Sequence, residues 1–194
     1  MKKYLLIAIT VLLLSCEVKQ DLSLYNTNKE VAQKMLMSYT SPTNFELFKS
    51  LIHEEVEHQS PMYGVGKVGL DGVIGQAEFY MTNFKDVTFE DQIWLPGVDE
   101  TTLKPDGSVR VYGTWKGVSI ATGKSFSLDS YHYFNAKEGK IFESGDFFDA
   151  NGMMIAVAAD EAVVTVVHRH PKGTKGQMPR IAMMTHYVGD LRAS

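Results

Sequence analysis

The feature that most constrains the fold of this chain is a change of hydrophobic pattern near residue 84. Before it, apolar residues recur at helical spacing, and after it four runs alternate in the manner of strands. These runs cover residues 87–95, 108–120, 124–134 and 140–148, with the turn sequences PDG, ATGK and AKEGK between them. Helices followed by an antiparallel meander predict an α+β fold, with the helices packed on one face of a sheet.

Three segments before residue 84 carry the helical pattern. The first starts at Asn28, which can cap it, and continues through Tyr39. The second is SPTNFELFKSLI, and the third is DGVIGQAEFYMTNF, for which Asp71 is the expected cap. Between the second and the third, EEVEHQSP predicts a short strand that ends at Pro61.

The N-terminus has the composition of a secretory signal peptide, predicted over residues 1–15. Two lysines precede an apolar run from Tyr4 to Leu14. This run is about half as long as a membrane-spanning helix, which needs roughly 20 residues. Cys16 follows it and is the chain's single cysteine, so we expect no internal disulfide. Residues 16–28 are polar and without periodicity, which predicts a flexible linker.

The stretch LLLSC, which ends at Cys16, resembles a bacterial lipobox. The resemblance implies cleavage before Cys16 and acylation of that residue, and several acyl chains would hold the domain firmly at a membrane. We therefore expect an exported domain, lipid-anchored to a bacterial cell membrane on its periplasmic or its cell-surface face. A free or buried thiol is the alternative.

Composition and charge narrow the function classes. With 44% hydrophobic and 22% charged residues, the chain is typical of one globular domain. A net charge of −4 without a basic cluster beyond the signal peptide argues against nucleic acid as a partner. Glycine-rich phosphate loops and the HExxH and GxSxG motifs are absent, and no cofactor is expected. The pattern assigns no role to the C-terminal extension, residues 156–194, where His168 and His170 share a strand face without a third metal ligand nearby.

Several segments together resemble the SnoaL-like members of the nuclear transport factor 2 (NTF2) superfamily: FELFKSLIHEEVEHQSP, YGTWKG, TGKSF, YHYF and EGKIFESGDFFDANG. The resemblance spans residues 29–155. It implies a cone in which a curved antiparallel or mixed sheet wraps around two to three N-terminal helices and encloses a pocket for a small apolar ligand. It also allows a homodimer through the outer face of the sheet. Since the family mixes cyclases, isomerases, hydrolases and domains without chemistry, the fold does not assign a reaction.

The resemblance implies an acid/base pair as well. SnoaL-type cyclases use an Asp in the last strand and a His in the strand before it, and these positions map onto Asp146 and His132. The sequence AKEGK independently predicts a hairpin with a three-residue turn. Counting back from that turn sets His132 opposite Ser144 and Asp146 opposite Ser130. The pair would then be diagonal neighbours on one sheet face, about 7–8 Å apart at the backbone.

The apolar residues expected around Asp146 predict an altered pKa for its carboxyl group. Phe142, Phe148 and Leu128 would flank Asp146, and such surroundings raise the pKa of a carboxyl group, which suits a general base. Ketosteroid isomerases carry their base just before the proline of the first strand. Ser60 occupies that place here, so isomerase chemistry of that kind is not expected.

Counting residues through the turn ATGK in the same way does not decide whether this face of the sheet is buried or solvated. It sets four further residues on the face of the His–Asp pair: Arg110, Tyr112, Thr114 and Lys116. A face with these residues could be solvated instead of forming a pocket. A bulge at Gly113 or Gly117 would reverse the assignment, because glycines within strands often mark bulges.

The remaining candidates are residues that could line an apolar pocket, since ligand sites are mostly aromatic with a few polar groups. The predicted ligand-binding residues are His58, Tyr63, Trp94, Tyr112, Trp115 and Phe148. Ordinary core packing is the alternative for each of them. Three functions stay open: a domain that binds a small apolar molecule, an enzyme with Asp146 as general base assisted by His132, and an interaction module with a filled cone.

Overall fold

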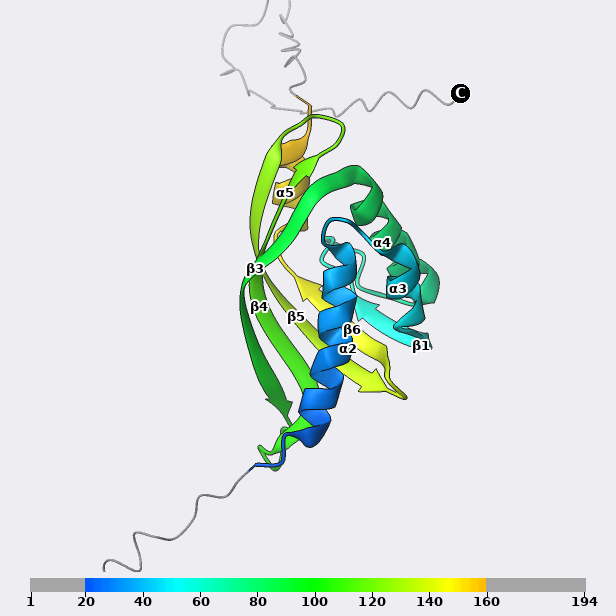
Figure 1. Cartoon of the computed structure of the whole chain (residues 1–194), viewed down its shortest axis with the longest axis vertical. Coiled ribbons are helices and arrows are strands. Elements are labelled where there is room, and N and C mark those ends of the chain that lie inside the picture. The colour runs from blue at the N-terminus through cyan, green and yellow to red at the C-terminus, as the bar shows by residue number, and fades with distance from the viewer. Residues whose placement is uncertain (1–19, 160–194) are drawn as a thin grey trace, which may run out of the picture. The chain divides into compact units, whose positions relative to one another are not determined.

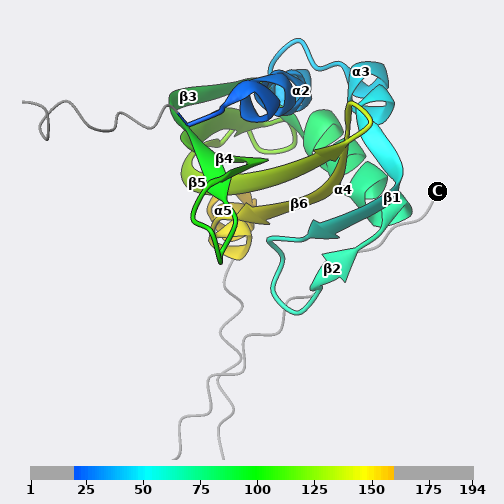
Figure 2. The same ribbon diagram turned by 90° about the horizontal axis from the view of Figure 1, so that it is seen from below.

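The computed structural model describes residues 20–159 and has the predicted α+β fold (Figure 1). Its sheet has six strands in the order β2-β1-β6-β5-β4-β3. β1 runs parallel to β6 and every other neighbouring pair is antiparallel, so the sheet is mixed. The strands are β1 (Ile52–Gln59), β2 (Lys67–Val68), β3 (Phe84–Val98), β4 (Pro105–Ser119), β5 (Ser125–Lys137) and β6 (Lys140–Phe147). The sheet is open and curves around the helices (Figure 2).

The helices are α2 (Ser23–Tyr39), α3 (Phe45–Ser50), α4 (Leu70–Asn83) and α5 (Ala150–Val157). α2 begins at Ser23, so the predicted linker is wrong for its last residues, and Asn28 is not a cap. Asn28 is instead buried, and its Nδ2 donates to the carbonyl oxygen of Gly107 at 2.8 Å, which ties α2 to β4. α4 starts after Gly69 rather than behind Asp71. None of the helices between residues 20 and 159 is long and apolar enough to span a membrane.

α5 was not predicted, and it continues the domain past the expected boundary at residue 155. Asp149 caps it, because its Oδ1 accepts a hydrogen bond from the backbone nitrogen of Gly152 at 2.8 Å. Met153 and Val157 pack against the start of β3 in a small apolar cluster. The helix therefore covers one end of the space between sheet and helices.

Bulges in β3 accompany the curvature of the sheet. The pairing of β3 with β4 shifts at three places, and two of them include Asp86 and Asp91, whose φ angles are 53° and 51°. Aspartate tolerates this left-handed conformation better than most residues. A bulge bends its strand and increases the local twist, so β3 can wrap around the helices.

The sequence left open a bulge at Gly113 or Gly117. The ladder between β4 and β5 has none there, because its register is continuous from Val109 to Val118. These glycines instead make room for aromatic rings. A Cβ at Gly113 would collide with the ring of Phe89, and one at Gly117 would lie 2.8 Å from the ring of Phe126. Both positions are therefore explained by close packing.

The register between β4 and β5 decides which side chains face the helices. Val111 pairs with His132 and is fully buried, so the alternate residues of β4 lie on the outer face. The prediction that polar β4 residues share the face of Asp146 is therefore wrong for all four of them: Arg110, Tyr112, Thr114 and Lys116.

Aromatic side chains cover part of this outer face. The rings of Tyr112 and Tyr131 are 4.9 Å apart, and those of Tyr131 and Phe147 are 5.6 Å apart. The guanidinium of Arg110 lies over the ring of Tyr133 at 5.4 Å. Tyr112 and Phe147 nevertheless keep 47% and 48% of their surface exposed. The outer face thus carries an uncovered aromatic strip across β4, β5 and β6.

The core lies on the other side of the sheet, against α2, α3 and α4. Its fully buried apolar side chains are Phe48, Val109, Val111, Phe134 and Ile141. The core does not fill this space completely. A cavity remains beside it, and the candidate site lies there.

Candidate functional site

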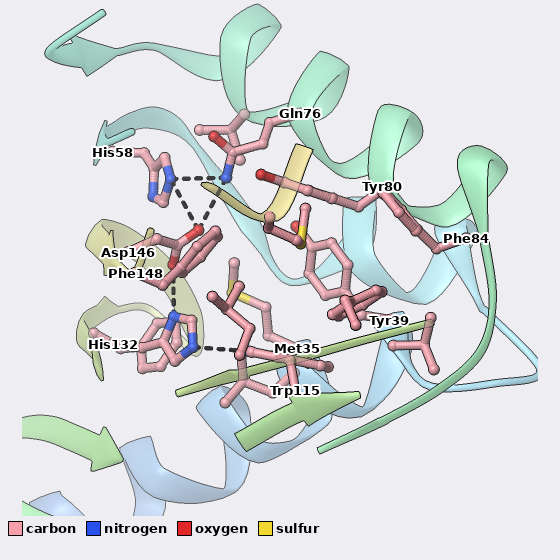
Figure 3. A pocket seen from close by; sticks show the side chains of 17 residues that line it. Met35, Tyr39, His58, Gln76, Tyr80, Phe84, Trp115, His132, Asp146 and Phe148 are labelled. Carbon is pink, nitrogen blue, oxygen red and sulfur yellow. Dashed lines mark hydrogen bonds and ion pairs between the residues drawn. The ribbon is translucent and has the colours of Figure 1, made fainter. Parts of the chain in front are cut away.

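A cavity of about 70 Å³ lies between the inner face of the sheet, α2, α4 and α5 (Figure 3). Seven of its lining residues carry phenyl, phenol or indole rings, and its polar groups converge on one side around Asp146. The lining residues are Met35, Leu36, Tyr39, His58, Val73, Gln76, Tyr80, Phe84, Val87, Trp115, Phe126, Leu128, His132, Phe134, Asp146, Phe148 and Met153. An apolar wall with a few converging polar groups is the usual composition of a ligand site.

His132 and Asp146 are direct cross-strand partners, not diagonal neighbours. The hairpin has a two-residue turn, in which Glu138 and Gly139 have φ angles of 55° and 74°, and a bulge follows beyond Ala136. The shorter turn and the bulge each move the register by one residue relative to the predicted hairpin. Because side chains alternate between faces, a shift of two residues keeps the same face. The prediction that His132 and Asp146 lie on one face of the sheet is confirmed. The prediction that they are diagonal neighbours is wrong.

Both carboxylate oxygens of Asp146 have partners. Oδ1 accepts a hydrogen bond from Nδ1 of His132 at 2.7 Å, and Oδ2 accepts one from Nε2 of Gln76 at 2.9 Å. Nε2 of His58 lies 3.4 Å from Oδ2. The side chain of Asp146 is 16% exposed, against 3% for each histidine. The carboxylate is therefore the part of this network that remains open to the cavity.

The far side of the His132 ring contacts Trp115 from β4. The indole Nε1 of Trp115 donates to Nε2 of His132 at 3.0 Å, and the Oγ of Ser130 lies 2.9 Å from the same nitrogen. Trp115 is held in place by Phe89, with which it stacks at 4.4 Å between ring centroids. The ring of His132 is thus hydrogen-bonded to an indole on one side and to a carboxylate on the other.

His58 is fixed in a similar way from β1. Its Nδ1 is 2.9 Å from the Oγ of Ser144, which is fully buried, and its Nε2 is 3.1 Å from Nε2 of Gln76. The Oγ of Ser60 donates to Oε1 of Gln76 at 3.3 Å. This contact turns the amide so that its NH₂ group faces both His58 and Asp146 (Figure 3).

The surroundings of Asp146 lower its pKa, contrary to the prediction. Burial by itself raises the pKa of this carboxyl group, but the imidazoles of His132 and His58 outweigh burial and hold it well below its ordinary value. The prediction weighed the apolar neighbours alone, whereas the partners that lower the pKa are His132 on the adjacent strand and His58 from a distant one. Burial and the nearby Asp146 raise the pKa of Tyr39 and of Tyr80, so both phenols stay protonated.

The structure places His58, Trp115 and Phe148 in the cavity wall together with the His–Asp pair. Three other predicted ligand-binding residues, and Phe142, lie outside the wall. Of these three, Tyr63 is 92% exposed between β1 and β2, Trp94 packs on the core with its Nε1 bonded to Gln92, and Tyr112 lies on the outer face. An aromatic residue serves a core, a loop or a surface equally well, so its type alone could not place it.

Twelve of the seventeen lining residues were not predicted as site residues, and one of these is Gln76, which donates to Asp146. For Gln76 the sequence did contain a signal. It lies three residues after Val73 and four before Tyr80, so it is a polar residue on the apolar stripe of α4. A polar residue at such a position usually has a buried partner, and here that partner is Asp146.

Within residues 20–159, no three His, Cys, Asp or Glu side chains are grouped so that they could hold a metal ion. Cys16, His168 and His170 lie outside the described residues, as does most of the predicted C-terminal extension. The polar groups that face the cavity are the carboxylate of Asp146, the amide of Gln76 and the imidazoles of His58 and His132.

An open sheet that curves around helices and encloses an aromatic cavity with them defines an NTF2-like cone. Such a cone is a domain of the small-molecule-binding or cyclase/isomerase type. The sequence model of one family in this superfamily, the SnoaL-like polyketide cyclases, matches residues 30–157. The chain belongs to that family. No protein of curated function matches it.

Solved structures share the fold at low sequence identity. A candidate polyketide cyclase from Xanthomonas campestris pv. campestris is 14% identical, with a TM-score of 0.56 over 70% of this chain and 100% of the other. A candidate isomerase from Bacillus subtilis is 13% identical, with a TM-score of 0.57 over 69% and 94%. A phenazine biosynthesis-related protein from Pseudomonas aeruginosa is 14% identical, with a TM-score of 0.55 over 86% and 96%. Such identities show the fold alone.

Proposed function

We propose that this domain binds a small, mostly apolar molecule in the cavity, with a polar group of the molecule against Asp146. The observation that supports this most is the cavity itself, because its wall is apolar except on the side where Asp146, Gln76 and the two histidines converge. Aromatic rings offer apolar contact area, and a single polar group fixes the orientation of a ligand. An interaction module with a filled cone would have no such space.

The ligand is small. Pockets for drug-sized ligands measure about 300–1,000 Å³, whereas this cavity measures about 70 Å³. Met35 and Met153 line it, and the flexible methionine side chain can change rotamer to admit a larger body. A molecule with one ring or one branched alkyl group suits the site better than a multi-ring one.

A second candidate function is an enzyme of the cyclase or isomerase type, in which Asp146 accepts a proton from the bound molecule. The convergence of His132, Gln76 and His58 on this carboxylate favours it, since such an arrangement holds a base in one position. A carboxylate with a depressed pKa is a weak base. It would therefore act only on substrates whose C–H bond is already acidic, and His132 would orient the base.

We also propose that the chain is anchored to a bacterial membrane through acylated Cys16. The signal-like segment and the sequence LLLSC support this, and α2 begins only a few residues later. In a bacterial host, Cys16→Ala should move the protein from the membrane fraction to the soluble fraction and abolish labelling with a fatty acid. Ser15→Ala is the matched control. Unchanged fractionation of Cys16→Ala would contradict the anchor.

The aromatic strip on the outer face of the sheet supports a further proposal, a homodimer through this face. Four apolar side chains there are about half exposed: Ile93, Leu95, Tyr112 and Phe147. Apolar area of this kind is stabilised when a partner covers it. In a homodimer, the aromatic strip of the second copy would cover the aromatic strip of the first.

The binding proposal is tested by a thermal-shift screen of small apolar compounds. Asp146→Asn keeps the shape of the side chain and removes its charge, and Asp129→Asn is the matched control because Asp129 lies on the outer face. Compounds that bind should raise the melting temperature of the wild type and of Asp129→Asn alike, and that of Asp146→Asn less. Equal shifts in all three proteins would remove Asp146 from the site.

A further inference from the structure

Two phenol groups in the wall of the cavity have no hydrogen-bond partner in the described part of the chain. The wall contains seven polar side chains, and five of them are joined by hydrogen bonds to one another: His58, Gln76, Trp115, His132 and Asp146. The other two are Tyr39 and Tyr80, whose hydroxyls bond to no residue between 20 and 159. These phenols are therefore the polar groups of the wall whose hydrogen-bonding capacity is unused.

Neighbouring aromatic side chains hold both phenol rings in place. The ring of Tyr39, the last residue of α2, meets Phe48 edge-on at 5.2 Å between centroids. The ring of Tyr80, on α4, meets Phe148 edge-on at 6.4 Å. Both hydroxyl groups point from the aromatic wall toward the side of the cavity where Asp146 lies (Figure 3). Because a phenol oxygen lies on the axis of its ring, this packing fixes where both hydroxyls are presented.

Both hydroxyls are able to donate a hydrogen bond to a bound molecule. Burial and, second, the nearby Asp146 raise the pKa of Tyr39 and of Tyr80, so each phenol keeps its proton at neutral pH. No fully buried side-chain nitrogen or oxygen between residues 20 and 159 lacks a hydrogen-bond partner. Since the two phenol oxygens do lack one, they are accessible, and they line the cavity. A tyrosine hydroxyl in such surroundings usually has a partner.

A carbonyl group of a ligand matches these two donors. Its oxygen has two lone pairs and no proton, so one carbonyl oxygen can accept from both hydroxyls. A hydrocarbon of the same shape would leave both hydroxyls unpaired, which costs free energy. The other lining residues beyond the polar side around Asp146 are apolar, and they suit an apolar carbon skeleton.

We propose that Tyr39 and Tyr80 determine the specificity of this site, and that their hydroxyls together bind the carbonyl oxygen of a small, otherwise apolar carbonyl compound. This inference rests on the proposed binding function and names the class of ligand. The carboxylate of Asp146 has lone pairs to spare, so it faces a hydroxyl or a polarised C–H group next to the carbonyl.

The test compares cyclohexanone with methylenecyclohexane, in which a CH₂ group replaces the carbonyl oxygen, by NMR titration of the purified full chain. Tyr39→Phe and Tyr80→Phe each remove one hydroxyl and keep the ring. Tyr131→Phe is the matched control, because Tyr131 lies on the outer face. Each cavity variant should weaken the binding of cyclohexanone by about three- to tenfold and leave that of methylenecyclohexane unchanged. Tyr131→Phe should change neither.

The other outcomes separate this inference from the binding function on which it rests. If both cavity variants bound cyclohexanone as tightly as the wild type, the carbonyl inference would be overturned and small-molecule binding would remain. An equal loss for both compounds would also overturn it, because the hydroxyls would then act through the packing of the cavity. If neither compound bound to the wild type, the binding function itself would fail, and the inference with it.

The infrared spectrum of bound cyclohexanone gives a second measurement, which needs no variant. A hydrogen bond to the oxygen weakens the C=O bond and lowers the frequency of its stretching band. In the wild type this band should therefore lie below its position for cyclohexanone in hexane, and it should move up in Tyr39→Phe and in Tyr80→Phe. A band at the hexane position in the wild type would overturn the proposal.

Discussion

Asp146 is the residue on which the site depends, because it is the carboxylate that opens into the cavity and three side chains are oriented by it. His132 and Gln76 donate to separate oxygens, and His58 is held by the same amide that binds Asp146. Each partner comes from a different element, so the carboxylate links α4, β1, β5 and β6. Changes at this residue should therefore affect both binding and stability.

The depressed pKa of Asp146 predicts an effect of acid on stability. The folded protein favours the ionised form, so this contribution is fully present above the ordinary value of 3.8 and is lost as the pH falls below it. Between about pH 4 and pH 2, the free energy of unfolding should fall more steeply for the wild type than for Asp146→Asn. Urea titrations at several pH values measure this. Parallel slopes, with Asp129→Asn as control, would contradict it.

Ser144 offers a second prediction at this scale. Ser144→Ala removes the hydrogen-bond partner of Nδ1 of His58 and leaves this buried nitrogen unpaired. The expected loss is about 1–3 kcal/mol in the free energy of unfolding. Ser127→Ala, on an exposed position of β5, should change it by less than about 0.5 kcal/mol. Equal free energies of unfolding for the two variants would show that this hydrogen bond does not contribute to stability.

How far these residues could be found from the sequence is clearest at the hairpin. The alternation of side chains put His132 and Asp146 on one face, and this survived an error in turn length because the bulge added a compensating shift. The pKa was predicted in the wrong direction, because the prediction weighed the apolar neighbours without the imidazole of His132, and because His58 reaches Asp146 from a distant segment. Contacts of that kind depend on packing, which local spacing does not encode.

At the scale of elements, the turn signals and the alternating runs predicted all four long strands. The bulges of β3 were not predicted, since Asp86 and Asp91 are exposed aspartates with no distinguishing pattern around them. The same holds for α5, a short helix whose stability comes from packing of Met153 and Val157. Local sequence patterns therefore predicted neither the curvature of the sheet around the cavity nor the helix α5 at its end.

Gly113 gives a prediction about the fit between β3 and β4. In Gly113→Ala the new methyl group would push on Phe89, which supports the ring of Trp115. The expected loss is about 1–3 kcal/mol in the free energy of unfolding. Gly75→Ala is the matched control, because its Cβ meets nothing within 4 Å and alanine favours the helix, so it should stabilise by about 0.5–1 kcal/mol. Chemical denaturation of both variants measures the difference, and a neutral Gly113→Ala would contradict the close approach.

Across the domain as a whole, the two faces of the sheet differ in their surroundings. The inner face and the helices enclose the cavity, and the outer face carries the aromatic strip. The resemblance to SnoaL-like domains predicted the cone correctly, as the family match and the solved structures show. The resemblance did not supply a ligand, because a shared fold does not assign a function.

The proposed homodimer predicts different effects of two otherwise matched substitutions. Tyr112→Glu places a charge within the aromatic strip, whereas Tyr63→Glu places one on a loop residue that is 92% exposed. Sedimentation equilibrium should show a dimer for the wild type and for Tyr63→Glu, and a monomer for Tyr112→Glu. A dimer that persists in Tyr112→Glu would exclude this face as the interface.

In the proposed function, Asp146 is the polar anchor of a small-molecule site. The decisive measurement is the dissociation constant of one compound from the thermal-shift screen, determined calorimetrically for the wild type, Asp146→Asn and Asp129→Asn. We expect Asp146→Asn to weaken binding by about tenfold or more, while Asp129→Asn leaves it unchanged. Equal dissociation constants for all three proteins would exclude Asp146 as the anchor.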